Sequence, residues 1–182
     1  MDKKVYERVI AKKEFSQLPK KDVEKAFESF EKRQVSEEEK IRLTRDLLRK
    51  VFSAFTSKKI LSLKNKNPEW ILRKHISTRE RIPYYKELYE RILKEFKEEI
   101  TIFDLGAGIN GFSYNYFPKK LYYIAIEAMG QLVDLMNYYF ETRGLEAMAL
   151  KESLFELEKI KKYIKQVKGN KIIFLFKTLD SL

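Results

Sequence analysis

The stretch "TIFDLGAGING", at residues 101–111, joins a short apolar run to a turn that contains three glycines. Gly106, Gly108 and Gly111 have the spacing G-x-G-x-x-G. A turn of this kind after a parallel strand brings backbone N–H groups and a helix N-terminus close to a ligand. The stretch lacks the G-x-x-x-x-G-K-[ST] pattern of nucleoside triphosphate sites. Its glycine spacing suits both a dinucleotide and S-adenosylmethionine, so the turn alone leaves both ligands open.

The sequence around this turn predicts alternating strands and helices. Four short apolar runs, rich in β-branched and aromatic residues, predict strands at residues 100–105, 121–127, 145–150 and 171–176. Two segments of helical length and periodicity, at residues 129–144 and 153–170, separate the last three of these runs. This alternation is typical of a parallel sheet with right-handed crossovers. Continuous apolar runs are typical of strands buried on both faces. The sequence therefore predicts an α/β fold.

The predicted sheet is short. Only four strand candidates fit between residues 100 and 182, and no helix follows the fourth. An open doubly wound sheet normally has more strands. We therefore expect a sheet truncated after its fourth strand, in a chain that is either an N-terminal portion of a longer protein or an unusually minimal one.

The first hundred residues predict helices. Ser36 and Glu39 have the spacing of a capping box and predict a helix start. Pro68 suits the first position of a short helix, and residues 85–96 carry an apolar stripe at i, i+3 and i+4. We predict a helical N-terminal domain over residues 1–74 and an α/β domain over residues 75–182.

Positive charge is concentrated in the predicted N-terminal domain. The formal net charge of the chain is +11. Residues 1–74 hold 21 Lys and Arg against 12 Asp and Glu, a net of +9, whereas residues 75–182 hold 17 against 15, a net of +2. This asymmetry indicates a surface for a polyanion such as RNA. The alternative is a solvated surface rich in lysine and glutamate, as in many heat-adapted proteins.

Composition excludes several kinds of site. The chain has no cysteine, which rules out disulfides and thiolate metal sites, and its single histidine argues against a histidine-based zinc site. No apolar run approaches the roughly 20 residues of a membrane span, and the N-terminus lacks the apolar segment of a signal peptide. We expect a cytoplasmic protein with no metal and no membrane partner. Its oligomeric state is open, with a monomer as the default.

Two acidic residues favour S-adenosylmethionine over a dinucleotide. Asp104 lies two residues before the first glycine, where its carboxylate can meet a ligand's ammonium group and would repel a pyrophosphate. Glu127 ends the second predicted strand, where a carboxylate accepts hydrogen bonds from ribose hydroxyls. The structural alternative is that Asp104 only caps the loop and that Glu127 is a surface strand end.

A second motif, "HISTRERIP", lies at residues 75–83. Ser77 and Glu80 have capping-box spacing, which predicts a helix that starts with Ser77 as its N-cap. The capping box leaves four residues unexplained: His75, Thr78, Arg79 and Arg81.

Together these motifs resemble the aminoglycoside-resistance 16S ribosomal RNA methyltransferases, the Arm/FmrO family. That family combines a basic helical N-terminal domain with the segments H-x-S-T-x-E-R, D-x-G-C-G-x-N-P and L-x-K-x-L-P-x-L. This chain has "HISTRER", "DLGAGINGF" and "LFKTLDSL" in that order, and the resemblance covers essentially all of it. Three residues depart from the pattern: Ala107 replaces a cysteine, and Gly111 and Asp180 each replace a proline.

The resemblance implies a Rossmann-like class I methyltransferase sheet and S-adenosylmethionine as cofactor. The methyl group would go to ring nitrogen 7 of a guanine in 16S rRNA, within the small ribosomal subunit. That nitrogen carries a lone pair and no proton, so the reaction needs alignment rather than a general base. Two alternatives stay open: a methyltransferase that acts on another RNA such as tRNA, and an inactive module that binds cofactor or RNA.

The resemblance also implies which residues form the site. Those assigned to the cofactor are His75, Thr78, Arg79, Arg81, Asp104, Gly106, Ala107, Gly108, Asn110, Glu127, Ala128, Glu152 and Ser153. In this assignment Arg79 or Arg81 pairs with the cofactor's carboxylate, Glu127 holds the ribose, and the segment that ends at Ser153 contacts the adenine. Those assigned to the mouth of the methyl-transfer site are Phe176, Lys177 and Leu179.

Overall fold

The computed structural model describes residues 1–52 and 67–176. Lys177 and Leu179, which the resemblance assigns to the mouth of the methyl-transfer site, and Asp180, which departs from the family pattern, lie outside the described residues. Within the described ranges, no helix has the length and apolar character that crossing a membrane requires.

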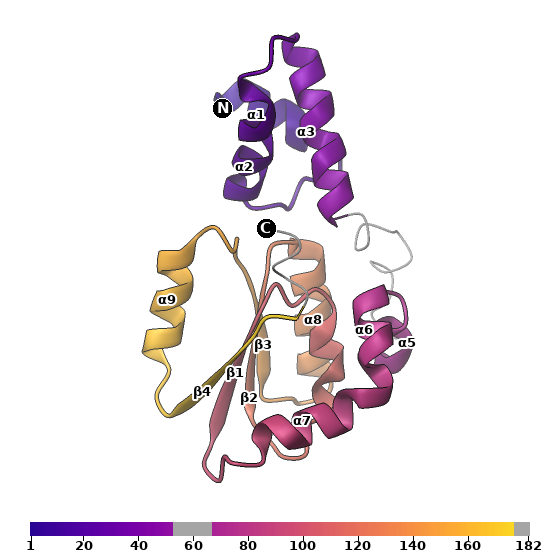
Figure 1. Cartoon of the computed structure of the whole chain (residues 1–182), viewed down its shortest axis with the longest axis vertical. Helices are drawn as coiled ribbons and strands as arrows, with labels where there is room; N and C mark the ends of the chain where they lie inside the picture. The colour runs from indigo at the N-terminus through magenta and orange to yellow at the C-terminus, as the bar shows by residue number, and fades with distance from the viewer. Residues whose placement is uncertain (53–66, 177–182) are drawn as a thin grey trace.

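Three helices form a separate group at one end of the molecule (Figure 1). They are α1 (Lys3–Ile10), α2 (Lys20–Glu31) and α3 (Glu37–Phe52), and they pack against one another. Their amphipathic periodicity turns one apolar face of each helix inward. The buried side chains at their centre are Val5, Val9, Val23, Phe27, Ile41 and Leu48.

The start of α3 follows half of the predicted capping box. The hydroxyl of Ser36 accepts a hydrogen bond from the Glu39 backbone N–H at 3.2 Å, so Ser36 is confirmed as the cap. The Glu39 carboxylate does not reach back to Ser36. It accepts hydrogen bonds from Arg42 at 2.6 and 2.8 Å instead. A charged partner one turn along the helix competes successfully for this carboxylate.

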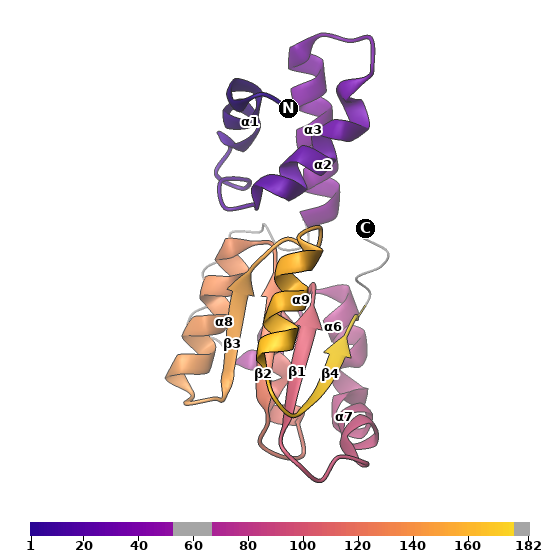
Figure 2. The same cartoon turned by 90° about the vertical axis from the view of Figure 1, so that its left-hand side faces the viewer.

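The predicted parallel sheet is confirmed. Its strands are β1 (Ile100–Leu105), β2 (Tyr122–Glu127), β3 (Ala147–Lys151) and β4 (Asn170–Phe174). They run parallel in the order β3-β2-β1-β4, and all of their carboxyl ends point toward the helical group (Figure 2). In sheets of this topology, ligands bind beyond the carboxyl ends of the central strands.

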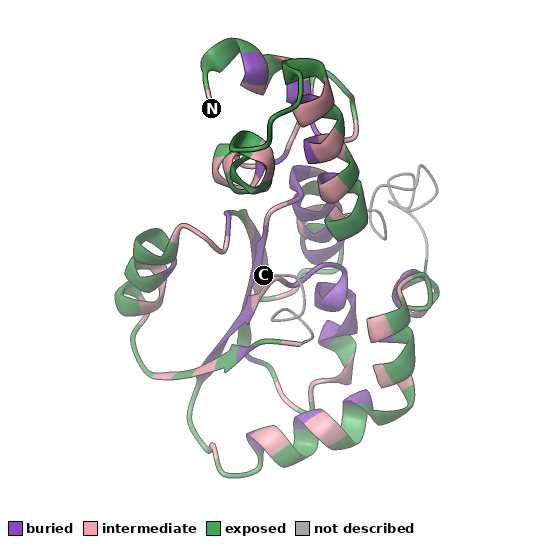
Figure 3. Ribbon diagram, turned by 45° about the horizontal axis from the view of Figure 1, so that its top comes forward, coloured by how far each residue is buried: buried purple, intermediate pink, exposed green. Residues whose placement is uncertain are grey.

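The helices between the strands cover opposite faces of the sheet (Figure 1). On one face lies α8 (Gly130–Thr142), which packs with the larger core. On the other lies α9 (Leu157–Gln166), whose Ile160 packs in a small cluster with alternate residues of β1 and β2: Phe103, Ile124 and Ile126. Buried residues follow the strands and α8, whereas α9 is mostly exposed (Figure 3). Two apolar side chains of the β4 segment, Ile173 and Leu175, are about half exposed.

A chain of short helices runs beside the α8 face of the sheet. It comprises α5 (Pro68–Leu72), α6 (Ile76–Arg81), the 3-10 turn η2 (Ile82–Tyr84) and α7 (Tyr85–Leu93). Helix α5 packs against η3 (Asn110–Tyr116), a 3-10 segment that follows the glycine turn. Residues 68–72 therefore lie with the sheet. The division of the chain at residue 74 stays a prediction.

The start of α6 differs from the sequence prediction. The helix begins at Ile76 and His75 is its N-cap residue, so Ser77 lies inside the first turn and the expected capping box is wrong. His75 has an extended backbone, and its carbonyl accepts the first intrahelical bond, from Arg79 N–H at 2.9 Å. The Ser77 hydroxyl is 2.7 Å from His75 Nδ1, where it holds the imidazole rather than a helix terminus.

The third glycine of the turn is required by packing. A Cβ atom on Gly111 would lie 2.8 Å from the Met136 sulfur and 2.8 Å from Cζ of Phe140, both on α8. Both α8 side chains are buried, so neither can move aside freely. Glycine at this position lets η3 approach α8 closely, which is the role of the third glycine in dinucleotide-binding folds as well.

We predict that Gly111→Ala lowers the free energy of unfolding by about 1 to 3 kcal/mol, the usual effect of overpacking a dense core. Urea denaturation would show a lower midpoint with an unchanged slope. The double variant Gly111→Ala/Met136→Ala should lose less stability than the sum of the losses in the two single variants. The reason is that the shortened side chain at position 136 makes room for the new methyl group. A variant as stable as the wild type would contradict the packing role.

Candidate cofactor site

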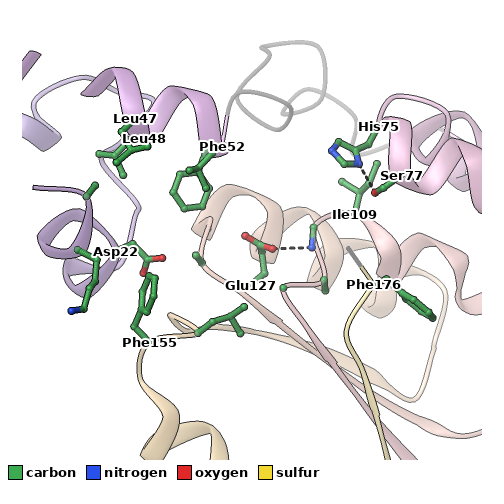
Figure 4. Close-up of a pocket in the computed structure, with 18 of the residues that line it drawn as sticks. Asp22, Leu47, Leu48, Phe52, His75, Ser77, Ile109, Glu127, Phe155 and Phe176 are labelled. Carbon is green, nitrogen blue, oxygen red and sulfur yellow. Dashed lines mark hydrogen bonds between the residues drawn. The ribbon is translucent and has the colours of Figure 1, made fainter. Parts of the chain in front are cut away.

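A cavity of about 690 Å³ lies at the carboxyl ends of the strands, between the sheet and helices α2 and α3 (Figure 4). Its volume is in the range of small-molecule sites. Each strand contributes to the wall through the residues that follow it: Gly106–Gly108 after β1, Glu127 and Ala128 at the end of β2, Leu154 and Phe155 after β3, and Phe176 after β4. The helical group and α6 complete the enclosure.

The glycine turn forms the floor of the cavity. Gly106 and Gly108 have φ angles of 69° and 55°, in the left-handed region that only glycine adopts without cost. The N–H groups of Gly106 and Ala107 both donate to the Ile126 carbonyl, at 2.9 and 3.1 Å. The turn is thus held against β2, where it lines the cavity.

Glu127 fixes the turn from the end of β2. One carboxylate oxygen accepts a hydrogen bond from Gly108 N–H at 2.8 Å, and the other accepts one from Met129 N–H at 2.9 Å. The side chain is buried, so Glu127 is not a surface strand end. Burial raises the pKa of Glu127, and the backbone donors oppose that shift. Each oxygen keeps a second lone pair with which it can accept a further hydrogen bond.

Asp104 is buried close to the turn, outside the cavity wall. Its Oδ2 accepts hydrogen bonds from Asn110 Nδ2 at 2.7 Å and from the Tyr123 hydroxyl. Its Oδ1 is buried and has no hydrogen-bond partner among the described residues. Burial raises the pKa of Asp104, and its two hydrogen bonds act in the opposite direction. A buried acceptor without a donor is costly, which makes this oxygen a candidate ligand contact.

Asn110 connects this carboxylate to the cavity wall. Its Oδ1 accepts hydrogen bonds from the Tyr85 hydroxyl at 2.6 Å and from Arg81 Nη2 at 3.3 Å. Burial raises the pKa of Tyr85 to about 12, so the phenol stays protonated and donates. The network therefore links the Arg81 guanidinium group, which lines the cavity, to the Asp104 carboxylate, which is buried behind the wall.

The HISTRER segment contributes one of its two arginines to the wall. Arg81 lines the cavity, and its guanidinium carbon lies 4.8 Å from the centre of the Phe176 ring. Arg79 is exposed and is not part of the wall. His75 and Thr78 also line the cavity. The Thr78 hydroxyl bonds to the Leu72 carbonyl, which joins the end of α5 to α6.

The segment after β3 lines the cavity with other residues than the two that the sequence analysis assigned to it, Glu152 and Ser153. Glu152 and Ser153 are buried but do not line the cavity. The Glu152 carboxylate forms an ion pair with Lys159 at 3.4 Å, and the Ser153 hydroxyl accepts a hydrogen bond from Phe155 N–H at 3.1 Å. The wall is formed by the next two residues, of which Phe155 provides an aromatic ring.

Of the predicted site residues that the structure describes, nine line the cavity: His75, Thr78, Arg81, Gly106, Ala107, Gly108, Glu127, Ala128 and Phe176. Five lie outside the wall: Arg79, Asp104, Asn110, Glu152 and Ser153. Sequence reasoning missed the wall residues that come from α2 and α3, among them Asp22, Leu47, Leu48 and Phe52. Their apolar spacing reads as ordinary helix packing, and no motif marks Asp22.

Comparisons with known proteins identify the fold. No protein-family model matches the chain, and no curated protein matches its sequence. Among solved structures, the chain is similar to the 16S rRNA methylase RmtB (TM-score 0.71, 15% identity, 84% of this chain and 64% of that one). It is also similar to the 16S rRNA methyltransferase RmtF in complex with S-adenosyl-L-homocysteine (TM-score 0.72, 18% identity, 86% and 65%). A third similar structure is an rRNA methylase from Escherichia coli (TM-score 0.63, 15% identity, 84% and 64%).

These similarities confirm the expected architecture, a helical N-terminal group followed by a methyltransferase-type sheet. The chain spans slightly less than two thirds of the length of these three structures. Two of them are 16S rRNA methylases, the class of protein that the motifs of the sequence resemble.

Proposed function

We propose that this chain binds S-adenosylmethionine in the cavity described above and belongs to an enzyme that methylates ribosomal RNA. The observation that carries the proposal is the order of chemical groups along the cavity. The cation Arg81 lies at one end beside Phe176, Glu127 lies in the middle, and the Phe155 ring lies toward the other end (Figure 4). The ligand has a carboxylate, a ribose and an aromatic base in the same order.

The amino-acid end of the ligand fits the network around Asn110. A zwitterion requires one cation and one anion close together, and the network links Arg81 to Asp104 through a single amide side chain. The unpartnered Oδ1 of Asp104 is an acceptor that an ammonium group would satisfy. A dinucleotide pyrophosphate offers no donor for that oxygen. This buried acceptor therefore supports a ligand with an amino-acid end.

When bound, S-adenosylmethionine supplies an electrophilic methyl group on a positively charged sulfur. The residues of the chain then have to hold the ligand and align it. Arg81 and Asp104 would hold its amino-acid end, the glycine turn would contact its middle, and Glu127 would hold its ribose. Phe176 lies in the cavity wall beside Arg81 and is the described one of the three residues that we assign to the target base. If the target is nitrogen 7 of a guanine, no proton has to be removed, and alignment accounts for the catalysis.

The N-terminal helices are the proposed RNA-binding surface. Part of their charge is used in ion pairs, since Arg8, Arg42 and Arg49 pair with neighbouring carboxylates. Lys12 and Lys13, which follow α1, are exposed. Residues 1–52, which hold these three helices, carry 15 Lys and Arg against 11 Asp and Glu, a net charge of +4, and this excess favours a polyanion as partner over a purely solvated surface. A ribosomal substrate also agrees with the predicted cytoplasmic location.

Transfer of a radiolabelled methyl group tests the proposed substrate. We expect label in 16S rRNA when the protein is incubated with isolated 30S subunits, and much less with 50S subunits or bulk tRNA. Borohydride and aniline treatment cleaves RNA at 7-methylguanine, so cleavage of the labelled rRNA would identify the methylated nitrogen. Label in tRNA alone would favour the second enzyme hypothesis. Cofactor binding without transfer to any RNA would favour the inactive module.

A further inference from the structure

The end of the cavity farthest from Arg81 is closed by the helical group. Asp22 of α2 lines this end together with Phe155, which follows β3 (Figure 4). The two elements approach each other here, since Ser153, Glu152 and Glu156 all lie close enough to the Asp22 carboxyl to act on its protonation. Burial, aided by these two carboxylates, raises the pKa of Asp22.

One oxygen of Asp22 has no donor. Its Oδ2 is buried and lacks a hydrogen-bond partner among the described residues. Lys25, which also lines the cavity, forms an ion pair with Glu28 at 2.7 Å. Lys159 pairs with Glu152 at 3.4 Å. A carboxylate in this position requires a donor that the described part of the chain does not supply.

The surroundings of this oxygen indicate what kind of donor fits. Phe155 supplies an aromatic ring, and Leu47, Leu48 and Phe52 of α3 supply apolar side chains to the same cavity. A ligand group in this place should be flat and mostly apolar, with an N–H at its edge. A solvated ammonium group would lose more hydration on entering these surroundings than a neutral amine.

We propose that Asp22 accepts a hydrogen bond from the exocyclic amino group of the adenine base and so makes the N-terminal helical group a specificity element of the cofactor site. This inference rests on the proposed function. It assigns to α2 the selection of a 6-aminopurine over a 6-oxopurine. A 6-oxo group would place its oxygen, an acceptor, against Asp22 Oδ2, which is also an acceptor. Neither oxygen would then receive a hydrogen bond.

Calorimetric titration with two ligands tests the assignment. S-adenosylhomocysteine carries the 6-amino group, and S-inosylhomocysteine carries a 6-oxo group in its place. We expect the wild-type protein to prefer the adenosyl ligand tenfold or more, as for a charge-assisted hydrogen bond. In Asp22→Asn the amide can donate to the oxo group, so the preference should fall to about one or invert. Glu24→Gln, on the same helix but outside the cavity wall, should keep the wild-type preference.

The outcomes test the cofactor site and the role of Asp22 separately. Binding of neither ligand by the wild-type protein would overturn the cofactor site and the role of Asp22 with it. Binding of both ligands with equal affinity by the wild type would overturn the role of Asp22 alone, as would an unchanged preference in a folded Asp22→Asn. The wild-type ratio does not depend on whether the variant folds, and a thermal melt reports the folding of the variant.

Discussion

Replacing Arg81 with alanine is expected to weaken the binding of S-adenosylhomocysteine by a factor of about 10 to 100. Arg81 is the arginine of the HISTRER segment that lines the cavity, and it lies at the end where we place the ligand's carboxylate. A hydrogen bond to a charged group contributes about 1.5 to 3 kcal/mol, which corresponds to this change in affinity. Calorimetric titration of the free protein measures the effect without any RNA substrate.

The chain offers a matched control two residues away. Arg79→Ala removes the same charge from the same helix, but its side chain is exposed and outside the cavity wall. We expect Arg79→Ala to bind the ligand like the wild type. Arg81→Lys keeps the charge and loses the forked geometry, so its affinity should be intermediate. Equal losses in Arg79→Ala and Arg81→Ala would show that the effect is general electrostatics, and the proposed contact would be wrong.

Arg81 also has a structural role that the experiment must separate from binding. Its guanidinium donates to the Tyr85 hydroxyl and to Asn110 Oδ1, each at 3.3 Å. Loss of these long bonds should lower the melting temperature only slightly. A melt with and without saturating ligand distinguishes the two effects, because a binding defect reduces the shift that the ligand produces.

The sheet was predictable because its signal is local. Buried parallel strands are continuous apolar runs, so residues 100–105 coincide with β1, and the predicted run at residues 171–176 overlaps β4. The glycine turn was predictable for the same reason, since a backbone with positive φ requires glycine at fixed positions. Such features depend on neighbours in the sequence and do not require knowledge of the tertiary structure.

Other parts of the site depend on contacts between distant segments. Asp22 reaches the cavity only because α2 packs over the carboxyl ends of the strands, and nothing in its own helix indicates this. Glu127 could be a surface strand end by sequence, and its burial follows from the Gly108 and Met129 N–H groups that bind it. The Ser77 prediction failed because capping spacing describes a helix start and does not say which of two polar residues, His75 or Ser77, is the cap.

Gly111 stands where the Arm/FmrO pattern has a proline, and the structure gives a physical reason for the glycine. A side chain there would meet Met136 and Phe140 of α8 at 2.8 Å, so glycine lets η3 lie against this helix. At Ala107 the side chain is small and buried in the turn, where it belongs to the core. The departures in the described part of the turn therefore concern packing, and the hydrogen bonds that shape the turn come from its backbone.

Replacing Asp104 with asparagine is expected to stabilise the protein at pH 8 and to weaken ligand binding about 100-fold. The folded-state pKa of Asp104 is raised, chiefly by burial. Folding therefore favours the protonated carboxyl: its contribution to stability is present below the unfolded pKa of about 3.9 and is lost as the pH rises through the folded pKa. Asparagine keeps an acceptor for Tyr123 and Asn110 without burying a charge. The stability gain of the variant should thus grow as the pH rises above 4.

The binding loss has a different cause and a separate readout. The unpartnered Oδ1 of Asp104 is the atom that we assign to the ligand's ammonium group, and the neutral amide removes that charge pair. An analogue of S-adenosylhomocysteine without the amino group should therefore bind the wild type and Asp104→Asn with equal affinity. Asp134→Asn, an exposed carboxylate on α8, is the matched control and should change neither stability nor binding. If Asp104→Asn weakened both ligands equally, the defect would lie in the shape of the glycine turn, and the carboxylate would have no direct part in recognising the amino-acid end.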